Sequence, residues 1–202
     1  MSTSTVGDES GSMPKKFWKR MGIASSVVGL AAWLMLFVIL PALGVARIYT
    51  LPTSGMEPTL ARGDHVLVNE LAYKFGEPQR GDLAVFSVNG IVDGPARDPE
   101  IVYVKRVAGL PGEKIAIRDG EVFINGRKAA EFSRFHHLTI PGNQFLATEH
   151  DEVTVPPASY FVLGDNSKNS ADSRYWGFVP RANFRSRVLA RLWRSTPSQE
   201  KR

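Results

Sequence analysis

The sequence predicts a mostly β domain that follows one N-terminal transmembrane helix. From Leu51 onward, short β-type runs alternate with Gly, Pro, Asn and Asp, and no helical period is longer than about three turns. Two tight-turn dipeptides, Asp119-Gly120 and Asn125-Gly126, bracket one of these runs, as a hairpin requires. Ahead of this region, Met21 to Ala46 form 26 consecutive uncharged residues, which is long enough to span a bilayer.

The length and composition restrict the class of protein. A chain of 202 residues holds one compact domain of about 150 residues with appendages. The absence of Cys excludes disulfides, iron–sulfur clusters and thiol catalysis. The formal charge of +5 falls to +3 from Arg47 onward, where 21 basic and 18 acidic residues remain. No basic patch is interleaved with aromatic residues, so we expect no nucleic-acid partner.

The charges around the apolar segment predict its topology. Four basic residues precede residues 21–46 and only Arg47 follows directly, so the positive-inside bias keeps residues 1–20 in the cytoplasm as a polar lead. The chain is then a single-pass protein of the cell membrane, anchored in lipid, with its β domain on the outer face. Gly44 and Ala46 also have the A-x-A-like spacing of a cleavable signal peptide, which is the alternative.

The exported β domain is predicted to cover residues 47–194, with a polar tail at 195–202. Residues 127–158 show no clear pattern. The segment from Arg174 to Arg202 carries eight basic residues and one acidic residue, and we expect a flexible, solvated end. The runs predicted as strands are His65–Val68, Leu83–Val88, Ile101–Val107, Lys114–Ile117, Glu121–Ile124 and Tyr160–Leu163.

Three segments carry candidate chemistry: LPTSGMEPTL (51–60), VKRVAGLPGE (104–113) and GDNSKNSADSRYWGFVP (164–180). The second places Lys105 in an apolar strand between Val104 and Val107. Burial disfavours the charged form of a lysine, so its neutral amine can act as a general base. The alternative is that Lys105 or Arg106 reaches the surface or pairs with a carboxylate.

These segments, in this order after an apolar anchor, resemble the signature boxes of type I signal peptidases, which are membrane-anchored Ser/Lys endopeptidases. The resemblance covers nearly the whole chain. It implies a β domain of coiled antiparallel sheets and the removal of signal peptides from exported preproteins with small-x-small cleavage sites, without a cofactor. The short span between Arg127 and Tyr160 implies a compact member without a large inserted subdomain.

The resemblance also implies roles for individual residues. Lys105 corresponds to the general base, and Ser170 to the residue whose hydroxyl orients that lysine. Thr53 corresponds to a side-chain donor of the oxyanion hole. Asp172 and Arg174 correspond to a structural ion pair beneath the site. The turn after the nucleophile corresponds to Met56, Pro58 and Thr59.

One position departs from the family pattern. The nucleophilic serine should directly precede Met56, but that position is Gly55, and Ser54 lies one residue early. A shift of one residue in an extended segment turns a side chain to the opposite face, so Ser54 would need a local backbone change to reach Lys105. Gly55 still offers a backbone N–H to an oxyanion. The chain is therefore either a peptidase with Ser54 as a displaced nucleophile or a catalytically inactive homologue or inactivated variant that binds signal peptides or a partner.

The histidines indicate no metal site and no Ser-His-Asp triad. His136 and His137 are adjacent and cannot both face one site from a strand, and no H-E-x-x-H spacing occurs. We expect all four His residues at the surface or in turns.

Overall fold

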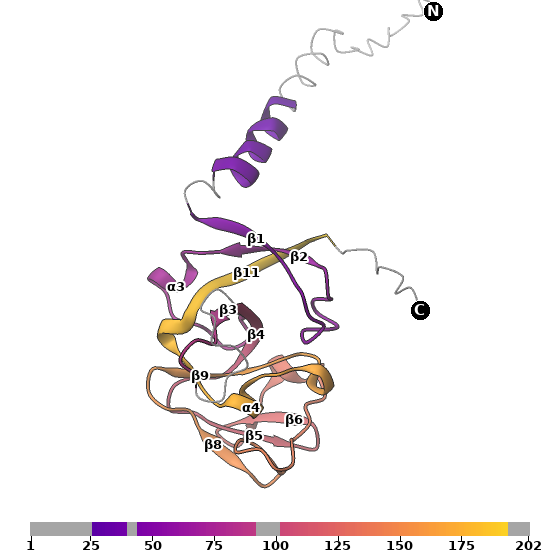
Figure 1. The fold of residues 1–202 in the computed structure, drawn as a ribbon, viewed down its shortest axis with the longest axis vertical. Coiled ribbons are helices and arrows are strands. Elements are labelled where there is room, and N and C mark those ends of the chain that lie inside the picture. Colours follow the sequence, from indigo (N-terminus) through magenta and orange to yellow (C-terminus); the bar gives the residue numbers. More distant parts are fainter. Residues whose placement is uncertain (1–25, 40–43, 92–101, 194–202) are drawn as a thin grey trace, which may run out of the picture. The chain divides into compact units, whose positions relative to one another are not determined.

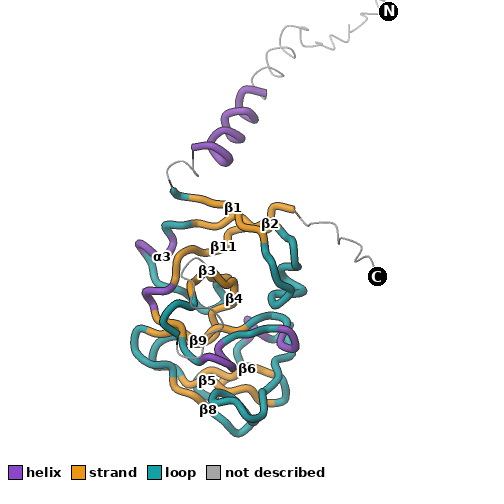
Figure 2. The backbone as a smooth tube through the Cα atoms, viewed as in Figure 1, coloured by secondary structure: helices purple, strands orange, loops and turns teal. Residues whose placement is uncertain are grey.

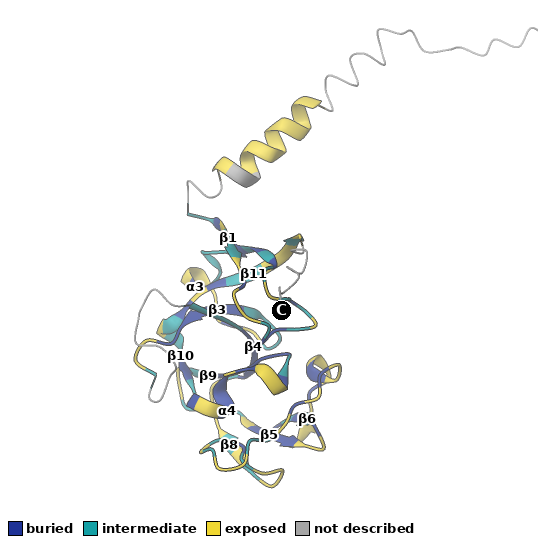
Figure 3. Cartoon of the chain, turned by 45° about the vertical axis from the view of Figure 1, so that its right-hand side comes forward, coloured by how far each residue is buried: buried dark blue, intermediate teal, exposed yellow. Residues whose placement is uncertain are grey.

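The computed structural model describes residues 26–39, 44–91 and 102–193, and the chain divides into two compact units, Met1–Leu43 and Gly44–Arg202. The described part of the first unit is an α-helix over 26–34 that continues as the π-helix η1 (Met35–Ile39). Its apolar side chains, such as Val28, Leu30 and Trp33, are exposed (Figure 3).

We find no helix within these described ranges that has both the length and the apolar character needed to cross a bilayer. Residues 21–25 and 40–43 of the predicted anchor lie outside the described residues. The predicted lead (1–20), residue 194 and the whole predicted polar tail (195–202) lie outside them as well.

The second unit consists of two antiparallel sheets (Figure 1). The larger has seven strands in the order β1-β2-β11-β3-β4-β9-β10, and the smaller has four in the order β7-β6-β5-β8. The larger sheet comprises β1 (Ala46–Thr50), β2 (His65–Asn69), β3 (Leu83–Ser87), β4 (Val102–Gly109), β9 (Ser159–Leu163), β10 (Val179–Pro180) and β11 (Phe184–Trp193). The smaller comprises β5 (Lys114–Arg118), β6 (Glu121–Ile124), β7 (Arg127–Lys128) and β8 (Glu152–Thr154).

Short helices connect these strands, and much of the rest of the unit is loop (Figure 2). They are α3 (Ala72–Phe75), η2 (Ala130–Phe132), η3 (Ser167–Asn169), α4 (Ser173–Trp176) and η4 (Arg181–Asn183). The mostly β prediction is confirmed, and the six predicted strands correspond to β2, β3, β4, β5, β6 and β9 within one or two residues at each end.

The expectation of a flexible, solvated end after Arg174 is wrong for the described residues up to Trp193. The ten residues of β11 form a central strand that pairs with β2 on one side and β3 on the other. Register shifts interrupt both pairings, and three arginines of the strand are exposed or half-buried. The bulges break the two-residue alternation, so the strand pattern is weak in the sequence.

Three hydrophobic clusters fill the unit, and one of them positions the candidate site. In that cluster the loop after β1 buries Leu51, Met56 and Leu60 against Val66 and Val68 of β2. These two valines alternate with half-buried residues along β2, as expected for a strand with one face in the core. The apolar residues on both sides of positions 53–55 therefore hold this loop to the sheet.

Candidate active site

Lys105 lies in the core of the larger sheet, where it pairs with Ala84 of β3. Its side chain is 3% exposed, and among the described residues it makes no hydrogen bond or ion pair. Burial lowers the pKa of Lys105, and the charges of Asp172 and Asp165 oppose this effect only in part. A lysine with a lowered pKa is more often neutral near pH 7, and its neutral amine is suited to act as a base.

Gly55 lies directly against the Lys105 amine. A Cβ at position 55 would be 2.9 Å from Lys105 Nζ, 3.2 Å from the Asn169 carbonyl oxygen and 3.6 Å from Ser170 Oγ. The structure thus places position 55, to which the resemblance assigns the nucleophilic serine, opposite the predicted base. The amine is the far end of a flexible side chain and can move aside, but a serine here would also require the Asn169 backbone oxygen to shift by a few tenths of an ångström.

Ser170 and Gly164 form the other wall of the site. Ser170 is buried, and its hydroxyl has no hydrogen-bond partner among the residues that the structure describes. A Cβ on Gly164 would lie 2.0 Å from Ser170 Oγ and 2.6 Å from the Gly55 carbonyl oxygen. Only glycine permits this approach of Ser170 and Gly55, since real Cβ contacts are not this short.

The structure places Ser54 and Thr53 differently from Gly55. The Ser54 hydroxyl accepts a hydrogen bond of 2.7 Å from Asn169 Nδ2 at the exposed side of the loop. Thr53 is exposed at the rim, and no hydrogen bond of its side chain is found in the described residues. Their roles as nucleophile and oxyanion donor stay predictions.

Asp172 and Arg174 form a fully buried ion pair, with both side chains at 0% exposure. The guanidinium donates to Asp172 through Nε and Nη2, each at 2.8 Å. The same carboxylate accepts from the backbone N–H of Gly164 at 2.9 Å, and Arg174 also donates to the carbonyl oxygens of Ser167 and Ser170. The pair therefore fastens the backbone of the 164–170 loop that carries Ser170.

A second buried pair joins all three candidate segments, and it confirms for Arg106 the alternative that this residue pairs with a carboxylate. Arg106 Nε and Nη2 donate to Asp165 Oδ1 and Oδ2 at 2.9 and 2.7 Å. Thr59 donates its hydroxyl to Asp165 Oδ2 at 2.5 Å. Both residues stand in the candidate segments, since Arg106 follows Lys105 directly and Asp165 follows Gly164. Which carboxylate Arg106 pairs with could not be predicted, because the two residues are 59 positions apart in the chain.

His137 corrects the expectation of surface histidines. It lies in a loop as expected, but it is 1% exposed and its ring contacts those of Phe132 and Phe135 edge-on. Burial, together with the charge of Arg174, lowers the pKa of His137 to about 4. The apolar ring neighbours on either side explain why this histidine is core rather than surface.

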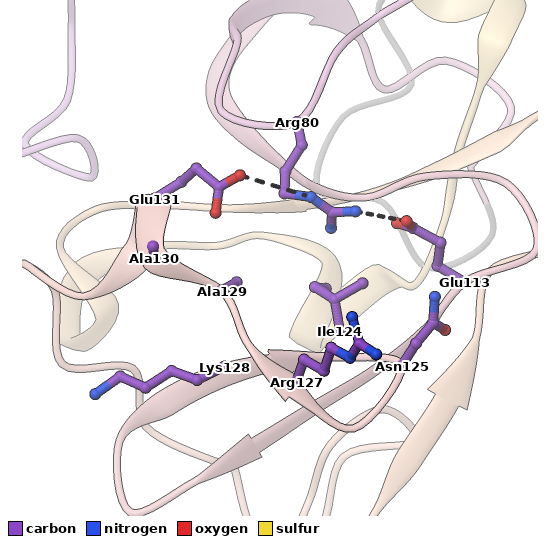
Figure 4. A pocket seen from close by; sticks show the side chains of 9 residues that line it. All are labelled: Arg80, Glu113, Ile124, Asn125, Arg127, Lys128, Ala129, Ala130 and Glu131. Atoms are coloured by element: carbon purple, nitrogen blue, oxygen red, sulfur yellow. Dashed lines mark hydrogen bonds and ion pairs between the residues drawn. The ribbon is translucent and has the colours of Figure 1, made fainter.

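Charged side chains of the described residues also gather away from this site. A hollow on the smaller sheet is lined by Arg80, Glu113, Lys128 and Glu131 (Figure 4), and it contains none of the predicted catalytic residues. Arg80 pairs with both glutamates there. Across residues 26–39, 44–91 and 102–193, no group of His, Asp and Glu side chains converges as metal ligands would.

Comparisons with known proteins identify the family of this chain. A profile of the family described as "Signal peptidase, peptidase S26" matches residues 24–193. The chain is 34% identical over 184 residues to a probable signal peptidase I-2 of Synechocystis sp., which covers 90% of this chain and 76% of that protein. It is 36% identical over 151 residues to a signal peptidase I of Bacillus caldolyticus, covering 72% of this chain and 78% of that protein. A solved signal peptidase I from Enterococcus faecalis V583 is 32% identical, with a TM-score of 0.42, covering 56% of this chain and 97% of that chain. The chain belongs to the signal peptidase I family, peptidase family S26.

Proposed function

We propose that this protein removes signal peptides from exported preproteins, with Lys105 as the general base. The observation that supports this most is the position of the buried Lys105 amine. Its pKa is lowered, and its Nζ would lie 2.9 Å from a Cβ at position 55, where the resemblance implies the nucleophile. A base must be neutral at the working pH to accept a proton, and burial supplies that condition.

The substrate would be a peptide with two small side chains in a small-x-small pattern, bound as an extended strand beside the site. The backbone N–H of Gly55 and the hydroxyl of Thr53 would stabilise the oxyanion that forms at the scissile carbonyl. Ser170 would orient the Lys105 amine, since its hydroxyl lies beside the same point at position 55. Asp172 and Arg174 would position the loop that carries Ser170 and would not contact the substrate, because both side chains are fully buried.

A second candidate function is a homologue that binds signal peptides without cleaving them. Two observations favour it. Gly55 has no side chain that could attack a carbonyl, and the Ser54 hydroxyl accepts a hydrogen bond from Asn169. Losing the nucleophilic serine of a serine protease lowers the rate about 10⁶-fold. A rate about 10³-fold above that of the uncatalysed reaction remains, because substrate binding and the oxyanion hole still act.

The two functions are separated by an assay of the full chain in detergent on a purified preprotein, beside its Gly55→Ser variant. We expect Gly55→Ser to raise cleavage by at least about 10³-fold, because it restores an oxygen opposite Lys105. Adding Lys105→Arg to Gly55→Ser should remove this gain, since a guanidinium stays protonated. If the chain with Gly55 does not cleave the preprotein, the proposed function fails, and cleavage by Gly55→Ser alone would then support the second candidate function.

We further propose the predicted topology: residues 1–20 cytoplasmic, 21–46 as the anchor in lipid, and 47–194 outside the cell membrane. The uncharged segment and its basic N-terminal flank support this arrangement. Protease added to spheroplasts should digest the β domain while the lead stays protected. A protected β domain would contradict the orientation, and a mature chain that begins at Arg47 would contradict the anchor.

A further inference from the structure

Three hydrogen bonds hold the backbone and side chain of residues 54–55 in place. Asn166 donates from its backbone N–H to the Gly55 oxygen at 3.1 Å and from Nδ2 to the Ser54 oxygen at 3.2 Å. Asn169 Nδ2 donates to Ser54 Oγ at 2.7 Å. Turning Ser54 toward Lys105 would break these contacts, and such bonds contribute about 0.5–1.5 kcal/mol each. The structure therefore argues against Ser54 as the attacking group.

The Ser170 hydroxyl and the Lys105 amine meet beside Gly55. The Ser170 hydroxyl is fully buried without a hydrogen-bond partner among the described residues, and no hydrogen bond of the Lys105 amine is found there. Both lie within 3.6 Å of the point that a Cβ of residue 55 would occupy, and the Asn169 carbonyl oxygen lies 3.2 Å from it. Buried polar groups are nearly always hydrogen-bonded, so this arrangement indicates a small polar partner.

A water molecule beside this point, in van der Waals contact with the Gly55 Cα, has the hydrogen-bonding groups that these neighbours require. It can donate one hydrogen to the lone pair of a neutral Lys105 amine and the other to the Asn169 oxygen, and it can accept from the Ser170 hydroxyl. The Cβ point itself is one bond length from the Gly55 Cα and 2.9 Å from Lys105 Nζ, so the water lies to the side of that point rather than at it. A serine at this position would fill that place with its own hydroxymethyl group.

We propose that Lys105 activates a water molecule beside Gly55, and that this water attacks the scissile carbonyl directly. This inference rests on the proposed function. The water oxygen forms a bond to the carbonyl carbon while Lys105 Nζ takes one of its protons. The C–N bond of the peptide then breaks, and the ammonium returns that proton to the leaving nitrogen. One water is consumed per peptide bond, and no acyl-enzyme forms.

The test measures cleavage of a preprotein by the full chain and its variants in detergent. The natural chain should cleave slowly, and Lys105→Met should be slower by at least about 10²-fold, the usual contribution of a general base. Lys74→Met, which removes an exposed lysine of α3, is the matched control and should keep the natural rate. Ser54→Ala should lower the rate far less than Lys105→Met does.

A second measurement does not depend on how Lys105→Met folds. Phenylalaninamide is added as an acceptor, because an acyl-enzyme can transfer its acyl group to such an amine whereas direct water attack yields only the carboxylate. We expect the transfer product with Gly55→Ser and none with the natural chain.

Three outcomes would overturn the inference. Loss of cleavage in Ser54→Ala, or transfer to the amine by the natural chain, would assign the attack to a side chain. An equal rate for Lys105→Met and the natural chain would remove Lys105 as the base. A chain with Gly55 that does not cleave, while Gly55→Ser does, would refute water activation together with the proposed function and would favour the second candidate function. The first two outcomes refute water activation or its base and leave the proposed function standing, because the chain with Gly55 still cleaves in both.

Discussion

Replacing Asp172 by Asn should destabilise the β domain severely, because the change leaves the Arg174 guanidinium buried without its counter-ion. Both side chains are at 0% exposure, and the carboxylate accepts from Arg174 Nε and Nη2 and from the backbone N–H of Gly164. An asparagine keeps the shape but presents an NH₂ group to one of these donors. Removing one partner of a buried pair costs about 3–5 kcal/mol, whereas the median exposed pair contributes about 0–1 kcal/mol.

For a unit of this size, 1 kcal/mol shifts the melting temperature by about 2–4 °C, so Asp172→Asn should lower it by about 6–20 °C. Thermal unfolding followed by circular dichroism measures this. The matched control is Glu152→Gln, which breaks the pair of Lys114 Nζ and Glu152 Oε1 at 3.3 Å, where the side chains are 59% and 32% exposed. If Asp172→Asn lowers the melting temperature no more than Glu152→Gln does, the reasoning is refuted. Adding Arg174→Met should recover part of the stability, because it removes the unpaired cation.

Three further predictions concern the walls of the site and the groups buried beside it. Gly164→Ala should lower the melting temperature, since its Cβ would lie 2.0 Å from Ser170 Oγ; an unchanged temperature would show that the loop can move aside. Lys105→Met should raise the melting temperature at pH 7, because burial lowers the pKa of Lys105 below 10.5 and the unfolded chain holds the proton more tightly; this gain should shrink as the pH approaches 10.5. Between pH 6.5 and 4 the unfolded chain binds a proton that folded His137 does not, so stability should fall with falling pH, by about 3 kcal/mol in total. Urea unfolding at pH 7 and pH 4 should show a smaller loss in His137→Phe, and equal losses would exclude His137 as the source.

The charge state of Lys105 links stability to chemistry in this fold. The burial that lowers its pKa also costs folding free energy at neutral pH, because the amine must lose its proton or its hydration. Catalytic groups are commonly kept in such unfavourable surroundings, at a cost that the rest of the core offsets. In this protein that core consists of the apolar clusters that pack around β4.

The sequence by itself determined the features that depend on neighbouring residues. Alternation and turn dipeptides placed β2, β5 and β6, because side-chain direction in a strand has a period of two residues. The motif around Met56 and the run from Gly164 to Pro180 indicated the family, and the absence of a serine at position 55 is visible in the sequence alone.

Only the tertiary structure decided what residues far apart in the chain do to one another. The loop with Asn166 and Asn169 binds the Ser54 segment, across more than 110 positions of sequence, and no local pattern encodes such a pairing. β11 became a central strand because β2 and β3 satisfy its backbone from both sides, although its bulges hide the alternation. His137 is buried because Phe132 and Phe135 fold around it. Burial and long-range hydrogen bonds are properties of the packed chain, since each depends on contacts that form only when distant segments meet.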